Sequence, residues 1–366
     1  MRDTPCLVVD ADVLEANLSA MAEHARARGL ALRPHAKTHK SLDIARHQLA
    51  HGAVGLTVAT VAEAEVFAAG GFDDLFIAYP IWAEGPRAER LRALTTLARV
   101  RVGADSVESV RMLAAAVHAG RRAAGSASDR ADSTPLAIAV EVDSGHHRSG
   151  CAPDRAAEVA AAARDARLAV DGVFTFPGHS YGLGAGDDAA RDEAAALTIA
   201  RDALTAAGIP CPIVSGGSTP SAHAADQGVL TELRPGVYAL GDAQQWELGS
   251  CDPASIALWA LATVVSRREG IVVLDAGSKM LGADRPGWTT GFGRVLDAPE
   301  ARIVALSEHH ATISLPVGMD APAVGTRMRV APNHVCSAVN LADALVIERA
   351  GVETGTWSVS ARGANT

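Results

Sequence analysis

Between about residue 30 and about residue 245, the chain alternates short apolar runs with alanine-rich stretches of helical periodicity. The expected strands are Leu30–Pro34, Gly55–Ala59, Leu75–Ala78, Val100–Gly103, Leu136–Val142, Val170–Phe176, Pro212–Ser215 and Glu232–Leu240. The helical stretches between them include Thr60–Gly70, Ser106–Ala119, Arg155–Ala166 and Ala189–Ala207. Such nearly even β/α repeats predict an α/β fold, a parallel (β/α)₈ barrel, in preference to a doubly wound sheet.

After about residue 255 the pattern changes to short strands separated by turn residues. These strands are expected at Leu261–Ser266, Ile271–Leu274, Thr312–Leu315, Arg327–Val330 and Trp357–Ser360. We therefore expect a barrel domain over residues 14–248, followed by a mainly antiparallel β domain over residues 249–366 that also includes residues 1–13. The Ser-, Ala- and Asp-rich segment Gly125–Thr134 is interpreted as an exposed loop within the barrel.

Composition excludes several classes of protein. The net charge is −9 and no basic run is present, which argues against a nucleic-acid partner. No apolar stretch is long enough to span a membrane, and the N-terminus lacks a secretory signal pattern. The five cysteines are odd in number and scattered, so they do not form a disulfide framework. We expect a cytoplasmic protein.

Lysine is nearly absent from the chain. Only Lys37, Lys40 and Lys279 occur, although Lys and Arg together number 33. A primary amine can form a Schiff base with an aldehyde and a guanidinium cannot, so the lysines that remain are candidates for covalent chemistry. Lys37 is the strongest candidate, because His35 and His39 would share its face on an extended chain. Imidazoles beside an amine help to keep it neutral and can transfer protons.

Further polar segments follow the expected strands, where barrel enzymes carry their active sites. These segments are Asp143–Arg148, Pro177–Tyr181, Ser215–Pro220 and Arg234–Tyr238. The Ser-Gly-Gly-Ser-Thr run at residues 215–219 follows the seventh strand and has the small and hydroxyl residues of a phosphate cradle. A reactive lysine after the first strand and a phosphate site after the seventh together indicate pyridoxal phosphate.

A possible metal site lies in the second domain. His334 and Cys336 would face the same side of a strand, and imidazole and thiolate suit zinc or a similar divalent ion. Two protein ligands leave room for water or substrate, as in a catalytic site. The His309–His310 pair lies nearby in sequence and strengthens this interpretation.

Taken together, these segments resemble the D-threonine aldolase and D-serine dehydratase family. The resemblance spans nearly the whole chain from Asp3. It rests on Arg33–Lys40, Glu141–Arg148, Gly178–Tyr181, Ser215–Pro220, Glu232–Tyr238 and Pro332–Cys336. It implies a barrel of the alanine racemase N-terminal type that binds pyridoxal 5'-phosphate, followed by a β domain that holds a divalent metal, Zn²⁺ or Mn²⁺.

The resemblance also assigns roles to residues. Lys37 forms the Schiff base with the cofactor, next to His35. Arg148 and Tyr181 contact the cofactor ring. His334 and Cys336 hold the metal. The residues expected near the phosphate are Ser215, Gly216, Gly217, Ser218, Thr219 and Tyr238. The catalytic base remains open between His179, His310 and a water on the metal.

The implied reaction is retro-aldol cleavage of a D-β-hydroxy-amino acid to glycine and an aldehyde. The alternative is a D-serine or D-3-hydroxyaspartate dehydratase that releases a keto acid and ammonia. Cys336 favours the dehydratase slightly, because the family's aldolases often carry His-x-Asp. A racemase is disfavoured, because Tyr79, Tyr181 and Tyr238 are the only tyrosines and none lies in the second domain. The extra domain argues against a non-catalytic cofactor carrier. A D-amino acid substrate and a homodimer are the expected partners.

Overall fold

The computed structural model describes residues 3–119, 136–225 and 228–366. The loop expected at Gly125–Thr134 lies outside these residues. The chain divides into two compact units, each built around its own sheet. One unit consists of Ala22–Lys37, Gln48–Pro235 and Ala364–Thr366, and the other of Met1–Met21, Thr38–His47 and Gly236–Gly363.

The first unit is a parallel barrel. Its sheet has eight strands in the order β2-β9-β8-β7-β6-β5-β4-β3. A parallel bridge between His35 and Thr57 joins the end of β2 to β3 and closes the barrel. The strands are β2 (Ala31–Leu32), β3 (Leu56–Val58), β4 (Asp74–Pro80), β5 (Arg99–Ala104), β6 (Ala137–Glu141), β7 (Ala169–Phe174), β8 (Ile213–Gly216) and β9 (Glu232–Leu233). The predicted (β/α)₈ barrel is therefore confirmed.

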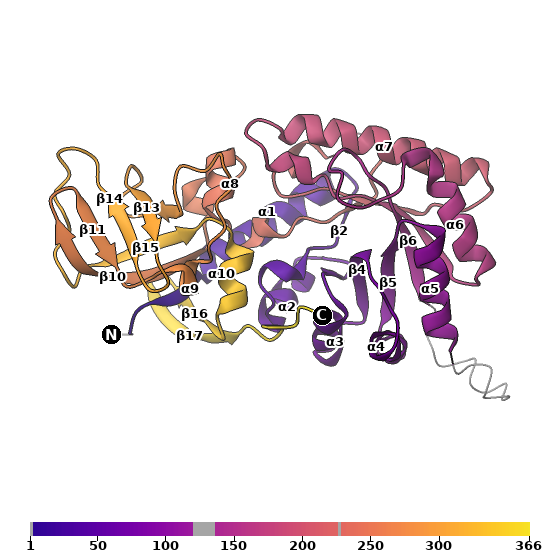
Figure 1. Ribbon diagram of the computed structural model, residues 1–366, viewed down its shortest axis with the longest axis horizontal. Coiled ribbons are helices and arrows are strands. Elements are labelled where there is room, and N and C mark those ends of the chain that lie inside the picture. The colour runs from indigo at the N-terminus through magenta and orange to yellow at the C-terminus, as the bar shows by residue number, and fades with distance from the viewer. Residues whose placement is uncertain (1–2, 120–135, 226–227) are drawn as a thin grey trace. The chain divides into compact units, whose positions relative to one another are not determined.

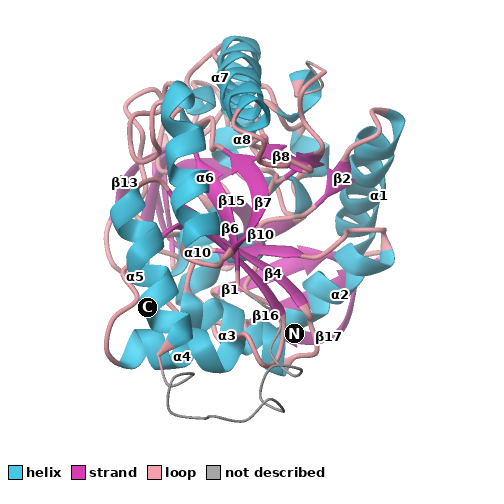
Figure 2. Ribbon diagram, turned by 90° about the vertical axis from the view of Figure 1, so that its right-hand side faces the viewer, coloured by secondary structure: helices cyan, strands magenta, loops and turns pink. Residues whose placement is uncertain are grey.

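Helices cover the outside of this barrel (Figures 1 and 2). They are α3 (Val61–Ala69), α4 (Pro86–Leu94), α5 (Val107–His118), α6 (Ala156–Asp165) and α7 (Gly186–Ala206). Their starts follow local sequence signals. The Thr60 side chain accepts from the Glu63 amide at the start of α3, and Ser106 and Ser109 form a capping box on α5. Two further helices are α1 (Ala11–Ala27) and α2 (Leu42–Ala50).

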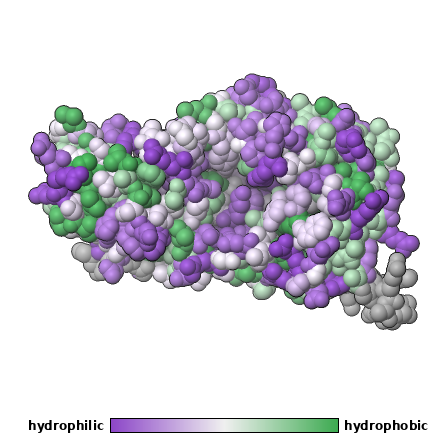
Figure 3. Space-filling view, viewed as in Figure 1, coloured by the Kyte–Doolittle hydropathy of each residue, from purple (hydrophilic) through white to green (hydrophobic). Residues whose placement is uncertain are grey.

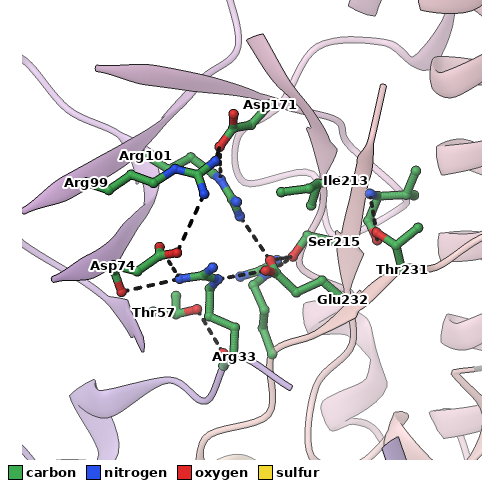
Figure 4. Close-up of polar contacts among 12 residues, drawn as sticks. Arg33, Thr57, Asp74, Arg99, Arg101, Asp171, Ile213, Ser215, Thr231 and Glu232 are labelled. Carbon is green, nitrogen blue, oxygen red and sulfur yellow. Dashed lines mark hydrogen bonds and ion pairs between the residues drawn. The ribbon is translucent and has the colours of Figure 1, made fainter. Parts of the chain in front are cut away.

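The parallel barrel has a charged interior. The side chains of Arg33, Arg101, Glu232 and Arg234 are each 5% exposed or less. Figure 4 shows Glu232 bridging two guanidinium groups: Arg33 Nε donates to its Oε2 at 2.7 Å and Arg101 Nη1 to its Oε1 at 3.1 Å. Asp74 and Asp171 supply further carboxylates to the same two arginines. Arg33, Arg101 and Glu232 are thus paired, while Arg234 donates to the Ser215 hydroxyl and the Thr175 carbonyl, as the burial of charged groups requires.

The second unit is an antiparallel β structure with a closed part. Strands β10, β11, β14, β13, β12 and β15 form a ring, because β10 pairs with both β11 and β15. The sheet continues from β10 through β1, β16 and β17. The bounds are β1 (Cys6–Asp10), β10 (Leu258–Arg268), β11 (Ile271–Leu274), β12 (Gly293–Val295), β13 (Arg302–Leu306), β14 (Ala311–Ser314), β15 (Arg327–Pro332), β16 (Ala344–Arg349) and β17 (Val352–Ser358). This confirms the predicted antiparallel domain.

The core of the second unit is apolar. Buried side chains such as Val264, Val272, Ile303, Ile313 and Val330 pack in one cluster. On the face shown in Figure 3, further hydrophobic residues lie scattered among polar ones over this barrel. Three short helices complete the unit: α8 (Ala243–Leu248), α9 (Ser278–Leu281) and α10 (Val335–Leu341). None of the helices in the described part of the chain is both long and apolar enough to cross a membrane.

The strand predicted at Glu232–Leu240 was wrong in length. Strand β9 ends at Leu233, and a 3₁₀ helix occupies Val237–Ala239. Pro235 explains the early end, because proline has no amide hydrogen for the ladder. Tyr238 therefore lies in this 3₁₀ helix and packs against the apolar core of the second unit.

Candidate active site

A cavity of about 510 Å³ opens within the parallel barrel and contains Lys37. His35, Arg148 and Arg234 also line it, as do three residues that were not predicted as site residues: Tyr79, Asp105 and Phe176. Lys37 lies two residues after the bridge at His35 that follows β2, Asp105 follows β5 directly, and Phe176 lies two residues after β7. The lining therefore comes from the carboxyl ends of several strands, which is where parallel barrels build their active sites.

The aromatic ring of Phe176 brings three predicted residues together. Lys37 Nζ lies 5.7 Å from the ring centroid, and the Arg148 guanidinium carbon lies 5.2 Å from it. The ring of Tyr181 is 6.3 Å from the ring of Phe176, centroid to centroid. Lys37, Arg148 and Tyr181 thus surround one hydrophobic surface, although they come from three separate loops.

The backbone around Lys37 differs from the extended chain that was predicted. Residues Ala36–Thr38 form one turn of 3₁₀ helix directly after the bridge at His35. Side chains therefore no longer alternate between two faces of an extended chain from Ala36 onward. His35 still lines the cavity with Lys37, whereas His39 is fully buried and accepts from the Ser41 amide. The prediction that all three side chains share one face was wrong for His39.

The loop after β8 contains the predicted phosphate cradle, and its polar groups are tied to their surroundings. Ser215 Oγ donates to Glu232 Oε1 at 2.6 Å and accepts from Arg234 Nε at 2.8 Å. The Gly217 amide donates to Glu193 Oε1 on α7 at 2.7 Å. Ser218 Oγ lies 2.8 Å from Ser180 Oγ. Ser215, Ser218 and Thr219 are all buried. The loop is thus held in place by β9, α7 and the loop after β7.

Burial perturbs the charged groups behind this loop. It lowers the pKa of Arg234 to about 10, and the carboxylates of Glu232, Glu193 and Glu141 oppose that shift. Burial also raises the pKa of Glu141, against a hydrogen bond from Ser149 and the charge of Arg148. Arg234 lines the cavity, and a charged group with a perturbed pKa in such a position is typical of a functional site.

His179 lies beside the cavity-lining segments in the 3₁₀ helix Gly178–Tyr181. Its Nε2 atom is 3.3 Å from Asp192 Oδ2 on α7, without the alignment of a hydrogen bond. His146 lies edge-on to Phe176 at 5.7 Å between centroids. Burial, Arg148 and His179 lower the pKa of His146, so this imidazole stays neutral at physiological pH.

In the second unit, His334 and Cys336 lie on a helix start and not on the predicted strand. Strand β15 ends at Pro332, His334 caps the N-terminus of α10, and Cys336 lies in its first turn. Cys336 Sγ contacts Thr38 Oγ1 at 3.4 Å. Burial lowers the pKa of His334, but the nearby Cys336 and Asp284 side chains raise it to about 11.

Asp284 is a partner that the sequence analysis missed. Its Oδ2 atom lies 2.6 Å from His334 Nδ1 and also accepts from Ser337 Oγ at 2.9 Å. A carboxylate on Nδ1 leaves Nε2 available, which is the usual arrangement behind a metal-binding histidine. No group of three or more His, Cys, Asp or Glu side chains suited to hold a metal occurs among the described residues. The residues present fit a divalent metal with an open coordination shell.

Two predicted residues, His310 and Tyr238, belong to the second unit, and their roles stay predictions. His310 is exposed in the turn between β13 and β14, where its carbonyl accepts from the Ser307 amide. Tyr238 belongs to the second unit, whereas residues 215–219 belong to the first. Of the residues that were missed, Glu193 had a detectable signal. It is a carboxylate on the buried face of α7, among Ala189, Ala190, Ala196 and Leu197.

Known sequences resemble the chain along nearly its full length. Residues 9–244 match the family described as alanine racemase, N-terminal domain, and residues 257–347 match a putative serine dehydratase domain. D-threo-3-hydroxyaspartate dehydratase from Delftia sp. is 35% identical over 92% of this chain and 91% of that protein. D-threonine aldolase from Arthrobacter sp. is 34% identical over 99% of this chain and 93% of that protein.

Solved structures agree with the sequence matches. The crystal structure of D-threonine aldolase from Filomicrobium marinum has a TM-score of 0.88 at 31% identity and covers 100% of this chain and 96% of its own. A structure of the D-threo-3-hydroxyaspartate dehydratase in which a cysteine is replaced by alanine, in a metal-free form, has a TM-score of 0.84 at 32% identity, over 98% of this chain and 97% of its own.

Proposed function

The chain belongs to the D-threonine aldolase and D-serine dehydratase family, and we propose that it is a lyase acting on D-β-hydroxy-amino acids with pyridoxal phosphate and a divalent metal. The main observation in support is Lys37 in the cavity of the parallel barrel, beside Phe176, Arg148 and Tyr181. The other two lysines are engaged elsewhere: Lys40 with Asn340, and Lys279 with Glu308.

The cavity suits pyridoxal phosphate in size and chemistry. Lys37 supplies the amine, Phe176 an apolar surface for the ring, and Arg148 and Tyr181 polar contacts beside it. Residues Ser215–Thr219 would hold the phosphate. When bound, the cofactor withdraws electrons from Cα of an amino acid, and a divalent metal acts as a Lewis acid on its β-hydroxyl.

We propose His334 and Cys336 as the metal ligands, with Asp284 orienting the His334 imidazole. In the related dehydratase, one solved variant lacks a histidine and another, in a metal-free form, lacks a cysteine two positions later. His334 and Cys336 have the same spacing. Zn²⁺ and Mn²⁺ remain the candidate ions, since two protein ligands and open positions accept either.

The position of the base separates the two candidate reactions. A base that takes the hydroxyl proton leads to Cα–Cβ cleavage, giving glycine and an aldehyde. A base that takes the Cα proton leads to loss of the hydroxyl, giving a keto acid and ammonia. His179, His310 and a water on the metal are the candidates for this role. We keep aldol cleavage as the main proposal and dehydration as the alternative; family members named in both ways resemble this chain to a similar degree.

A product assay tests this proposal. The enzyme, loaded with cofactor and Mn²⁺ or Zn²⁺, is incubated with D-threonine and with D-threo-3-hydroxyaspartate. Glycine with an aldehyde identifies the aldolase, and ammonia with a keto acid identifies the dehydratase. If neither D-amino acid is consumed while the cofactor is bound, the proposed substrate class is wrong.

We further propose a cytoplasmic homodimer, with a cofactor domain over residues 14–248 and a metal domain over 249–366 together with 1–13. Solution scattering on the active enzyme measures the mass directly. An active monomer would contradict the dimer. Limited proteolysis should cut near residue 248 in addition to any cut in the loop expected at Gly125–Thr134, and a boundary cut at a different position would contradict the proposed domains.

A further inference from the structure

Glu193 is a buried carboxylate to which the reaction assigns no role. It lies on α7, outside β7 and β8, and only 1% of its surface is exposed. Its Oε1 atom accepts the Gly217 amide hydrogen at 2.7 Å. Its Oε2 atom has no hydrogen-bond partner among the described residues. An apolar residue would fill this position without the cost of burying a carboxylate.

Gly216 and Gly217 of the loop lie directly against the Glu193 carboxylate. A Cβ on Gly216 would lie 2.3 Å from Glu193 Oε1, so only glycine allows this close approach. Gly217 has a φ of +82°, in the left-handed region that glycine adopts without strain. The carboxylate therefore contacts the turn at the two positions where the chain has no side chain. The hydrogen bond to Gly217 fixes the turn in this conformation.

The charge of Arg234 acts on the Glu193 carboxylate. Burial raises its pKa to about 7, while the Gly217 amide and the charge of Arg234 oppose that shift. Arg234 itself faces Glu232 and Glu141, so it is shared among three carboxylates. Glu193 is thus not a simple ion-pair partner of Arg234. Its direct contact with a functional segment is the hydrogen bond to the loop.

We propose that Glu193 is a positioning residue that holds loop 215–219 in the conformation that receives the cofactor's phosphate, and so makes the barrel prefer phosphorylated over unphosphorylated pyridoxal. The inference rests on the proposed function, because it requires pyridoxal phosphate to be the cofactor. It differs from a general stabilising role, which would affect both forms of the cofactor alike.

The test compares dissociation constants for pyridoxal phosphate and pyridoxal, measured by absorbance titration of the cofactor-free enzyme. In Glu193→Ala the Gly217 amide loses its buried acceptor, and we expect affinity for pyridoxal phosphate to fall about 10- to 100-fold. Affinity for pyridoxal should change less than about twofold, as pyridoxal has no phosphate to place. Glu193→Gln keeps an acceptor oxygen and should retain most of the preference.

Asp202→Asn is the matched control, since Asp202 is an exposed α7 carboxylate paired with Arg201. Circular dichroism confirms that each variant is folded. If Glu193→Ala does not fold, Glu193→Met, which fills the buried position but also removes the acceptor oxygen, is measured in its place with the same two titrations. Equal losses for both cofactor forms, or no loss in Glu193→Ala, would overturn the role of Glu193. Wild-type enzyme that does not bind pyridoxal phosphate at all would instead overturn the proposed function.

Discussion

The two barrels of this protein have interiors of opposite character. The parallel barrel encloses a network of Arg33, Arg101, Glu232 and Arg234, whereas the antiparallel barrel encloses valine, isoleucine and leucine. Buried charges contribute little net stability, yet removing one partner is costly. Apolar packing contributes stability at every position and tolerates small changes.

This difference separates the two candidate parts of the active site. In the parallel barrel, the charge network reaches the cofactor cavity directly, because Arg234 belongs to both. In the antiparallel unit, His334 and Cys336 lie at the start of a helix that follows β15, and Cys336 packs against the apolar core. The chemistry of the first barrel thus borders a charged interior, and that of the second unit borders an apolar one.

The largest effect is expected from a change at the proposed metal site of the antiparallel unit. Replacing Cys336 with alanine should abolish metal-dependent turnover, and treating the wild-type enzyme with a chelator should do the same. In Cys336→Ala and in the chelator-treated enzyme, the cofactor absorbance and the unfolding temperature should stay close to those of the untreated wild type. Cys211→Ala serves as a control, as Cys211 is also a half-buried free thiol. Full activity of Cys336→Ala without added metal would contradict the assignment of the ligand.

The second largest effect is expected when the charged interior of the parallel barrel loses a carboxylate. Glu232→Gln keeps the shape of the side chain but leaves the guanidinium groups of Arg33 and Arg101 short of a carboxylate. We expect the free energy of unfolding to fall by about 3–5 kcal/mol. Ile313→Val in the apolar barrel removes one buried methyl group and should cost about 0.5–1.5 kcal/mol. Denaturant titration of both variants measures this contrast, and similar losses in the two would break the comparison.

The smallest effect is a pH dependence that belongs to the parallel barrel. Burial raises the pKa of Glu193 to about 7 from its ordinary value of 4.5, so the folded state binds its proton more tightly than the unfolded state. The resulting stabilisation is fully present below pH 4.5 and is lost as the pH rises through 7, by about 3 kcal/mol at most.

Unfolding free energies of wild type and Glu193→Gln, measured between pH 5 and pH 8, check this prediction. Because the glutamine does not titrate, the wild type should lose stability relative to the variant as the pH rises. A constant difference between the two proteins over this range would show that Glu193 does not titrate there.

The sequence predicted those features that depend on local pattern. The β/α repeats and the antiparallel strands were predicted because periodicity is visible over a few positions, and the residue chemistry of Lys37 pointed to a side chain that lines the cavity. The His334-x-Cys336 metal site stays a prediction. Features that depend on distant partners were missed. The bridge of His35 to Thr57 and the turn after it could not be seen in residues 33–40 alone. The contact of Asp284 with His334 joins residues far apart in the chain, with no spacing rule to reveal it.

The most direct test of this account is to locate the cofactor on the chain. Borohydride reduction of the enzyme with bound pyridoxal phosphate, followed by peptide mass mapping, identifies the lysine that carries it. With only Lys37, Lys40 and Lys279 in the sequence, the result is unambiguous. The account predicts that the label is on Lys37 alone. A label on Lys40 or Lys279, or an unlabelled protein, would contradict the placement of the reaction in the charged barrel.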